Sequence, residues 1–207
     1  MGASDHLVTT LEQLEALYGE KMPTSIVKEI DHISEGYRKL IEAAPFVTVA
    51  TSGPEGLDCS PKGDAPGFVK ILDDRTLAIP DRPGNNRLDG FRNIVRDPRV
   101  ALLFLIPGVG ETLRVNGRAE ISIEPELMAA FSVNGKLPRA VMIVHIETIY
   151  FHCSKAIVRS KLWNEETRID RRSLPSTGTI IAELSGGKLG GDVYDREAPE
   201  KIKAQLY

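Results

Sequence analysis

The feature that most constrains the fold is an alternation of apolar and polar residues between Thr112 and Ile123. The apolar positions, which share one face of an extended chain, are Leu113, Val115, Ala119, Ile121 and Ile123. Because successive side chains of a strand point to opposite faces, this pattern predicts a long strand with one face in the core. Gly117 interrupts the pattern and predicts a bulge or a bend.

Short β-branched runs, separated by Gly, Pro and Asp turn signals, predict further strands on both sides of this one. They cover residues 46–52, 67–72, 76–80, 100–106 and 141–153. Helical patterns at 4–19 and 23–44 precede them, and a short one at 124–131 is interposed. Residues 100–106 are all apolar, as expected of a strand that is covered on both faces. Regular alternation of strands and helices is missing, so we expect an antiparallel sheet or closed barrel.

Composition limits the function classes. The 207 residues carry 26 Lys and Arg against 29 Asp and Glu, a formal net charge of −3, which gives no reason to expect nucleic-acid or membrane binding. No apolar run approaches the ~20 residues that span a bilayer, and no signal-peptide pattern opens the chain. Cys59 and Cys153 make no disulfide framework or metal pattern and are expected to be buried, inert thiols. We expect a single-domain, soluble, cytoplasmic protein without a metal.

A cluster of basic residues near position 85 raises the question of a local anion site. Arg82 and Arg87 flank the start of a predicted helix, where Asn85 or Asn86 can act as the cap. The first N–H groups of a helix carry partial positive charge, so the arginines would be repelled unless an anion lay between them. A phosphate would satisfy both. Alternatively, Arg87 pairs with Asp81 or Asp89, and the turn has no ligand.

The order of these segments resembles the pyridoxamine 5′-phosphate oxidase-like, FMN-binding split-barrel family. The resemblance is carried by residues 44–122, which include RDPRVALLFLI and RVNGRAEIS, and by CSKAIVRSKLW at 153–163. It implies a mainly β fold, a six-stranded antiparallel split barrel with N-terminal helices, formed by residues 45–163. Residues 1–44 would then be an N-terminal helical extension and 164–207 a C-terminal extension. The resemblance further implies a homodimer with FMN in clefts at the subunit interface.

The resemblance also implies FMN-binding residues within the barrel. Asn86 and Arg87 match the family's phosphate position, although its common Ser-Arg-Lys motif is absent, and Arg82 is added as their neighbour. Lys62 falls where the family's second strand passes the flavin; alternatively it is an exposed turn lysine. Thr112 aligns with a flavin-contacting glutamine of the oxidase. Arg114 matches a family arginine, although a cross-strand partner would also explain it.

After the last predicted strand, the resemblance implies residues that cover the flavin of the partner subunit. They are Lys155, Arg159, Ser160 and Trp163. Trp163, the only tryptophan, could equally belong to a core or an interface. The family likeness implies an FMN-dependent oxidoreductase acting on an unknown small molecule, with no catalytic side chain assigned. The alternative is a non-catalytic flavin- or haem-binding protein on the same barrel, because a fold does not determine an activity.

Overall fold

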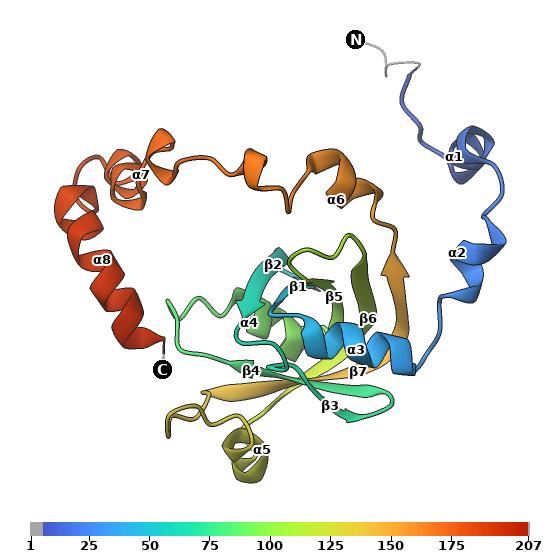
Figure 1. Ribbon diagram of the computed structural model, residues 1–207, viewed down its shortest axis with the longest axis horizontal. Helices are drawn as coiled ribbons and strands as arrows, with labels where there is room; N and C mark the ends of the chain where they lie inside the picture. The colour runs from blue at the N-terminus through green and yellow to red at the C-terminus, as the bar shows by residue number, and fades with distance from the viewer. Residues whose placement is uncertain (1–5, 207) are drawn as a thin grey trace.

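A seven-stranded antiparallel sheet is the centre of the computed structural model, which describes residues 6–206 (Figure 1). Its strands lie in the order β2-β1-β5-β6-β7-β4-β3. Their bounds are β1 Phe46–Gly53, β2 Gly56–Gly63, β3 Lys70–Asp73, β4 Thr76–Asp81, β5 Arg99–Leu105, β6 Thr112–Ser122 and β7 Ala140–His152. The antiparallel, mainly β fold with flanking helices is confirmed. The sheet has seven strands rather than six, and it includes β2, whose sequence lacks apolar alternation but whose backbone pairs with β1 throughout.

The hydrophobic core lies on the inner face of the curled sheet. Its most deeply buried side chains include Val47, Leu77, Ile79, Leu102, Phe104, Leu113, Val115 and Ile149. The alternation in β6 therefore does direct one face into the core, but the prediction is wrong for Ile123, which lies beyond β6 and is exposed. In β5 the expectation of two covered faces is only half met: Val100, Leu102 and Phe104 are buried, whereas Ala101, Leu103 and Leu105 are half-exposed on the outer face.

Gly117 lies at a bulge, as the sequence predicted. The register between β6 and β7 shifts at Asn116 and Gly117. A Cβ atom at position 117 would come within 2.1 Å of the carbonyl oxygen of His145, so no side chain fits there.

Three short helices pack against the sheet: α3 (Glu35–Ala43), α4 (Asp89–Arg96) and α5 (Pro125–Ala129). The prediction of one helix over 23–44 is wrong, since α2 (Pro23–Val27) and α3 are separate. Between them Ile30 forms a bridge with Ile149 of β7, because extended backbone there can bond to the sheet whereas a continuous helix could not.

Asn93 attaches α4 to the sheet, and its amide Nδ2 donates to Thr51 Oγ1 at 3.2 Å and Gly56 O at 3.3 Å.

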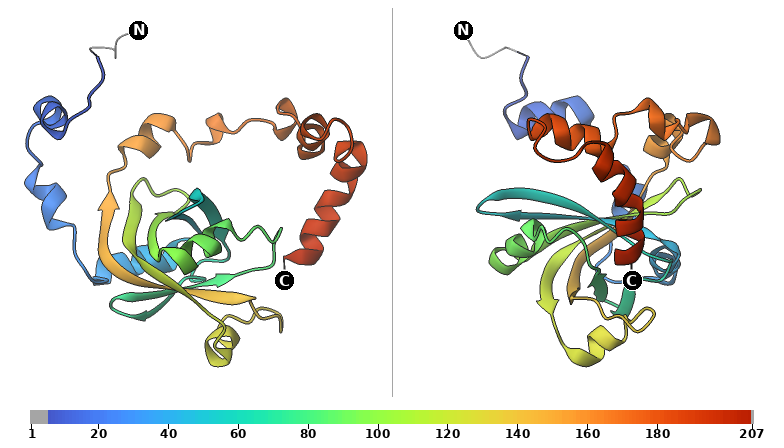
Figure 2. Two further views of the ribbon diagram at one scale, coloured as in Figure 1. Left: turned by 180° about the vertical axis from the view of Figure 1, so that it is seen from behind. Right: turned by 90° about the vertical axis from the view of Figure 1, so that its left-hand side faces the viewer.

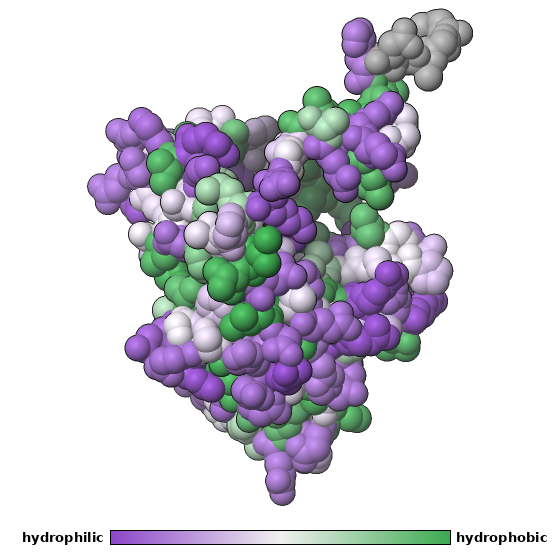
Figure 3. All heavy atoms as spheres, turned by 90° about the vertical axis from the view of Figure 1, so that its right-hand side faces the viewer, coloured by the Kyte–Doolittle hydropathy of each residue, from purple (hydrophilic) through white to green (hydrophobic). Residues whose placement is uncertain are grey.

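The two ends of the chain extend away from the barrel (Figures 1 and 2). One end carries α1 (Leu11–Tyr18); residues 4–5 of the predicted helix lie outside the described residues. The other carries α6 (Lys155–Ser160), two 3-10 turns (Glu165–Thr167, Arg171–Ser173), α7 (Thr177–Leu184) and α8 (Gly191–Gln205). Apolar side chains such as Leu11 and Ile26 are exposed on the N-terminal segment, where Figure 3 shows apolar patches. Within residues 6–206, no helix combines the length and apolar composition required to cross a bilayer.

Candidate functional site

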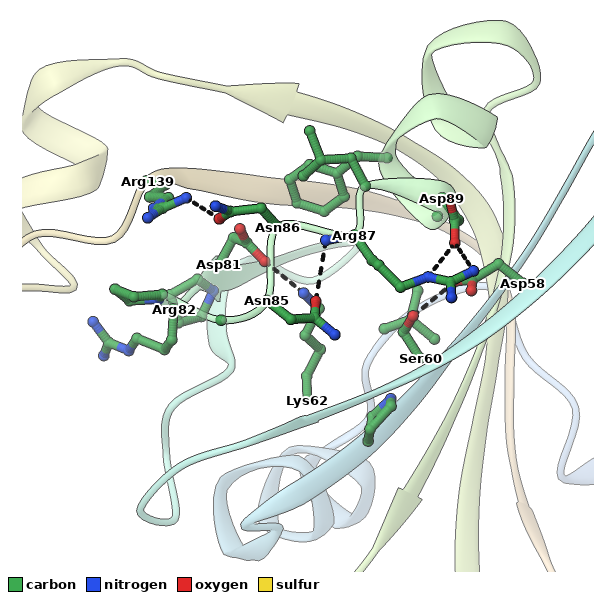
Figure 4. Close-up of a pocket in the computed structure, with 18 of the residues that line it drawn as sticks. Asp58, Ser60, Lys62, Asp81, Arg82, Asn85, Asn86, Arg87, Asp89 and Arg139 are labelled. Atoms are coloured by element: carbon green, nitrogen blue, oxygen red, sulfur yellow. Dashed lines mark hydrogen bonds and ion pairs between the residues drawn. The ribbon is translucent and has the colours of Figure 1, made fainter. Parts of the chain in front are cut away.

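A pocket of about 520 Å³ lies between β2, the end of β4 with the turn that follows it, and α4 (Figure 4). Its wall includes Lys62, Arg82, Asn86 and Arg87, so four of the ten predicted binding residues come together. The same wall also carries three carboxylates, Asp58, Asp81 and Asp89. Apolar contacts come from Val49, Phe68, Leu88, Phe91 and Ile94. The pocket thus combines an apolar wall with convergent charged groups, as ligand sites do.

The turn after β4 is shaped by its two asparagines. Asn85 Oδ1 accepts the backbone N–H of Arg87 at 3.0 Å, which is an Asx turn. Asn86 has a φ of 60°, a left-handed conformation that asparagine tolerates better than most residues. The prediction that Asn85 or Asn86 caps α4 is wrong, because the N-cap position falls on Leu88, which provides no side-chain hydrogen bond. The start of α4 therefore faces the pocket without a side-chain cap.

Arg87 forms the ion pair that the sequence left open as an alternative. Its Nε and Nη2 atoms lie 2.9 Å and 2.8 Å from Asp89 Oδ2, and the arginine side chain is 79% exposed. The hydrogen bond that Arg87 donates to Asp89 raises the pKa of Arg87, so its guanidinium group keeps its charge. An exposed pair of this kind is weak and readily exchanged, so Arg87 can still turn to a ligand.

Lys62 and Arg82 are each held by a carboxylate, Asp81 in the pocket wall and Asp64 outside its lining. Lys62 Nζ lies 2.5 Å from Asp81 Oδ1, and the two side chains are 24% and 17% exposed. The same ammonium group lies 5.3 Å from the centre of the Phe91 ring, a cation–π contact. Lys62 is therefore not an exposed turn lysine. Arg82 donates from Nε to Asp64 Oδ2 at 3.0 Å and from Nη1 to Phe131 O at 2.7 Å.

The other six predicted residues do not line this pocket. They belong to the first part of β6 and to the chain that follows β7, and we call this group the α6 cluster: Thr112, Arg114, Lys155, Arg159, Ser160 and Trp163. Thr112 pairs with His152 across the strands, and the Arg114 guanidinium lies 5.2 Å from the centre of the Tyr150 ring. Trp163 Nε1 donates to Val109 O at 2.7 Å, which attaches the chain after α6 to the β5–β6 turn.

Sequence reasoning missed one cation of the pocket, Arg139. It lies just before β7, and its backbone N–H donates to Asp81 O at 3.0 Å at the end of β4. Its side chain donates from Nη1 to Asn86 Oδ1. The sequence does show Arg139 directly after Pro138, just before a predicted strand. Its place in the pocket depends on the pairing of β7 with β4, and periodicity does not reveal which strands pair.

Cys59 and Cys153 are free and exposed, so the expectation that they are buried is wrong. Cys59 lies on edge strand β2 and Cys153 directly after β7, where the barrel ends. Within the described part of the chain, no three His, Cys, Asp or Glu side chains converge as a metal site would require.

The curled antiparallel sheet places the chain in the class of antiparallel β proteins with flanking helices, and a charged, partly apolar pocket lies at its side. Residues 33–153, more than half of the chain, match the family model described as pyridoxamine 5′-phosphate oxidase, and the chain belongs to this family. No curated protein matches it.

Solved structures to which the chain is similar include HupZ of Group A Streptococcus, with 25% identity over 59% of this chain and 95% of that chain, and a TM-score of 0.48. An F420 reductase shares 21% identity over 56% of this chain and 98% of its own, with a TM-score of 0.41. General Stress Protein 26 from Bacillus anthracis shares 17% identity over 55% and 88%, with a TM-score of 0.42.

Proposed function

We propose that the protein binds FMN noncovalently in the pocket beside α4 and acts as an FMN-dependent oxidoreductase on a small molecule. The observation that carries this proposal is the pocket itself, in which Arg87, Asn86 and the start of α4 converge within a barrel of the pyridoxamine 5′-phosphate oxidase family. Charge-assisted hydrogen bonds from arginine and backbone N–H groups at a helix start are the interactions that hold a phosphate.

The pocket fits a flavin nucleotide in size and chemistry. Its volume of about 520 Å³ lies within the ~300–1,000 Å³ that ligand pockets usually have. Its charged end offers donors to a phosphate, while Phe68, Phe91 and Leu88 offer apolar surface to a ring system. A haem iron instead takes His, Cys, Met or Tyr as ligands, so the arginine and amide groups here favour a phosphate-bearing cofactor.

We further propose that the site is completed by a second copy of the chain. Ala50 of β1 lies opposite Ala101 of β5, and both, with Leu103 and Leu105, form a half-exposed apolar outer face. A second barrel that packs on this face would supply the missing cover for β5. The α6 cluster of each chain would then reach the flavin of its partner, which explains why those residues lie outside the pocket of their own chain.

In this proposal FMN, when bound, supplies the redox chemistry, and the protein supplies binding and orientation. Arg87 and Asn86 hold the phosphate. Lys62 stays beside the ring edge, where Asp81 keeps its ammonium group in place. No side chain needs to act as an acid or a base.

The test is an absorption spectrum of the purified protein before and after addition of FMN, with excess ligand removed. The sample is then mixed anaerobically with a nicotinamide donor and afterwards exposed to air. Retained flavin bands that bleach with the donor and recover in air are expected. Retained bands that never bleach with any nicotinamide donor favour the alternative, a flavin-binding protein without turnover. A protein that takes up haem and no flavin contradicts the proposal.

A further inference from the structure

We propose that Arg139 is a phosphate-binding residue of the pocket, acting with Asn86 from the side opposite Arg87. This inference rests on the proposed function and adds to it a residue outside the basic turn after β4. The strand pairing brings Arg139 there, since Asp81 of β4 lies opposite Ala140 of β7. Figure 4 shows the Arg139 guanidinium directed at the Asn86 side chain, on the far side of the turn from Arg87.

The electrostatic environment distinguishes Arg139 from the other pocket cations. Lys62 and Arg87 are paired with Asp81 and Asp89, and Arg82 is paired with Asp64, whose side chain is only 7% exposed. Arg139 donates to a neutral amide oxygen instead, and among residues 6–206 it makes no ion pair. Its charge is therefore the one that a phosphate would neutralise without first displacing a carboxylate.

The side-chain amide of Asn86 offers a second hydrogen-bond donor to the phosphate. The backbone of Asn86 has a left-handed φ of 60°, and the side-chain Oδ1 accepts a hydrogen bond from the Arg139 guanidinium. The Nδ2 group of the same amide is then left to donate to an anion. Arg139 and Asn86 together present a guanidinium and an amide N–H to one phosphate, and the guanidinium fork can donate to two of its oxygens at once.

The same geometry gives Arg82 a positioning role. Its guanidinium donates hydrogen bonds to Asp64 and to the carbonyl of Phe131, two residues beyond α5. These two bonds hold the Arg82 side chain in place at the pocket wall. The sequence had predicted Arg82 beside Arg87 at the phosphate; in this inference Arg139 takes that role and Arg82 does not contact the phosphate.

The experiment compares FMN with riboflavin, which lacks the phosphate. The full-length protein, freed of flavin, is titrated with each compound, and quenching of flavin fluorescence gives the Kd. Arg139→Gln is expected to weaken FMN binding at least about tenfold and to change riboflavin binding less than about twofold. The matched control is Lys136→Gln, an exposed lysine three residues earlier that does not line the pocket, and it should change neither Kd.

Equal weakening of FMN and riboflavin binding by Arg139→Gln would overturn the inference, because Arg139 would then only support the turn. Unchanged FMN affinity would overturn it as well. If Arg139→Gln does not fold, Arg139→Lys keeps the charge but loses the planar fork, and a several-fold loss for FMN alone is expected. Wild-type protein that binds neither compound would instead refute the proposed function itself.

Discussion

At the scale of single residues, the pocket is a set of charges that hold one another in place. Lys62 and Arg82 are partly buried and paired, so each is positioned before any ligand arrives. Arg87 is exposed, and its pair with Asp89 is of the kind that contributes little to stability. Exchange of Asp89 for a phosphate therefore costs Arg87 little, which makes it the residue whose removal should act on ligand binding rather than on folding.

We predict that Arg87→Ala weakens FMN binding by more than tenfold, because a charge-assisted hydrogen bond to the phosphate is lost. Fluorescence titration with FMN measures the change. The matched control is Arg99→Ala, since Arg99 pairs with Asp97 two residues before it, just as Arg87 pairs with Asp89 two residues after it, and it does not line the pocket. Unchanged FMN affinity in Arg87→Ala would remove this residue from the site.

At the scale of elements, α4 connects the pocket to the barrel. Its start forms part of the pocket wall, and Ile94 packs into the core. Asn93 is a buried polar residue whose amide donates to Thr51 of β1 and to the carbonyl of Gly56, the first residue of β2. A Cβ atom on Gly53 would lie 2.3 Å from Asn93 Oδ1, so the helix sits directly on the hairpin. The position of α4, and with it the pocket, depends on this contact.

Asn93→Ala should lower the free energy of unfolding by about 1–3 kcal/mol, because the hydroxyl of Thr51 loses its buried partner. Urea denaturation measures the loss. Val95→Ala on the same helix serves as the control, since Val95 is 79% exposed and should change stability by less than about 0.5 kcal/mol. Equal stability of wild type and Asn93→Ala would show that α4 is held by its apolar contacts alone.

At the scale of the whole molecule, one chain leaves much apolar surface uncovered. The outer face of β5 is half-exposed, and both terminal segments carry exposed apolar side chains, among them Leu14, Met22, Leu184 and Ile202. Surfaces of this kind usually mark sites of protein association. The homodimer that we propose would cover the face of β5. The assignment of 1–44 and 164–207 as extensions of a single domain stays a prediction.

Leu103→Arg should convert the expected dimer into monomers and abolish tight FMN binding, because it places a charge beside Arg114 in the middle of the outer face. Sedimentation analysis and FMN titration measure the two effects. Ile123→Arg is the control, because Ile123 is 73% exposed beyond the end of β6. A wild-type protein that is monomeric and still binds FMN tightly would contradict the dimeric site.

The sequence alone determined features that depend on local periodicity and backbone sterics. The alternation in β6, the bulge at Gly117 and the short strands without helical crossovers all follow from which residues fit a pleated, half-buried surface. The gathering of Lys62, Arg82, Asn86 and Arg87 was also within reach, because three of them lie in one turn and the resemblance supplied the fourth.

Only the tertiary structure decided the features that depend on contacts between distant segments. Ile30 pairs with Ile149, which divides an apparently continuous helical pattern in two. The pairing of β4 with β7 brings Arg139 to Asn86, 53 residues earlier in the chain. The six residues of the α6 cluster lie outside the pocket for the same reason, since their position depends on where β6 and β7 end. Periodicity reports which face of an element is buried, but strand order decides which elements meet.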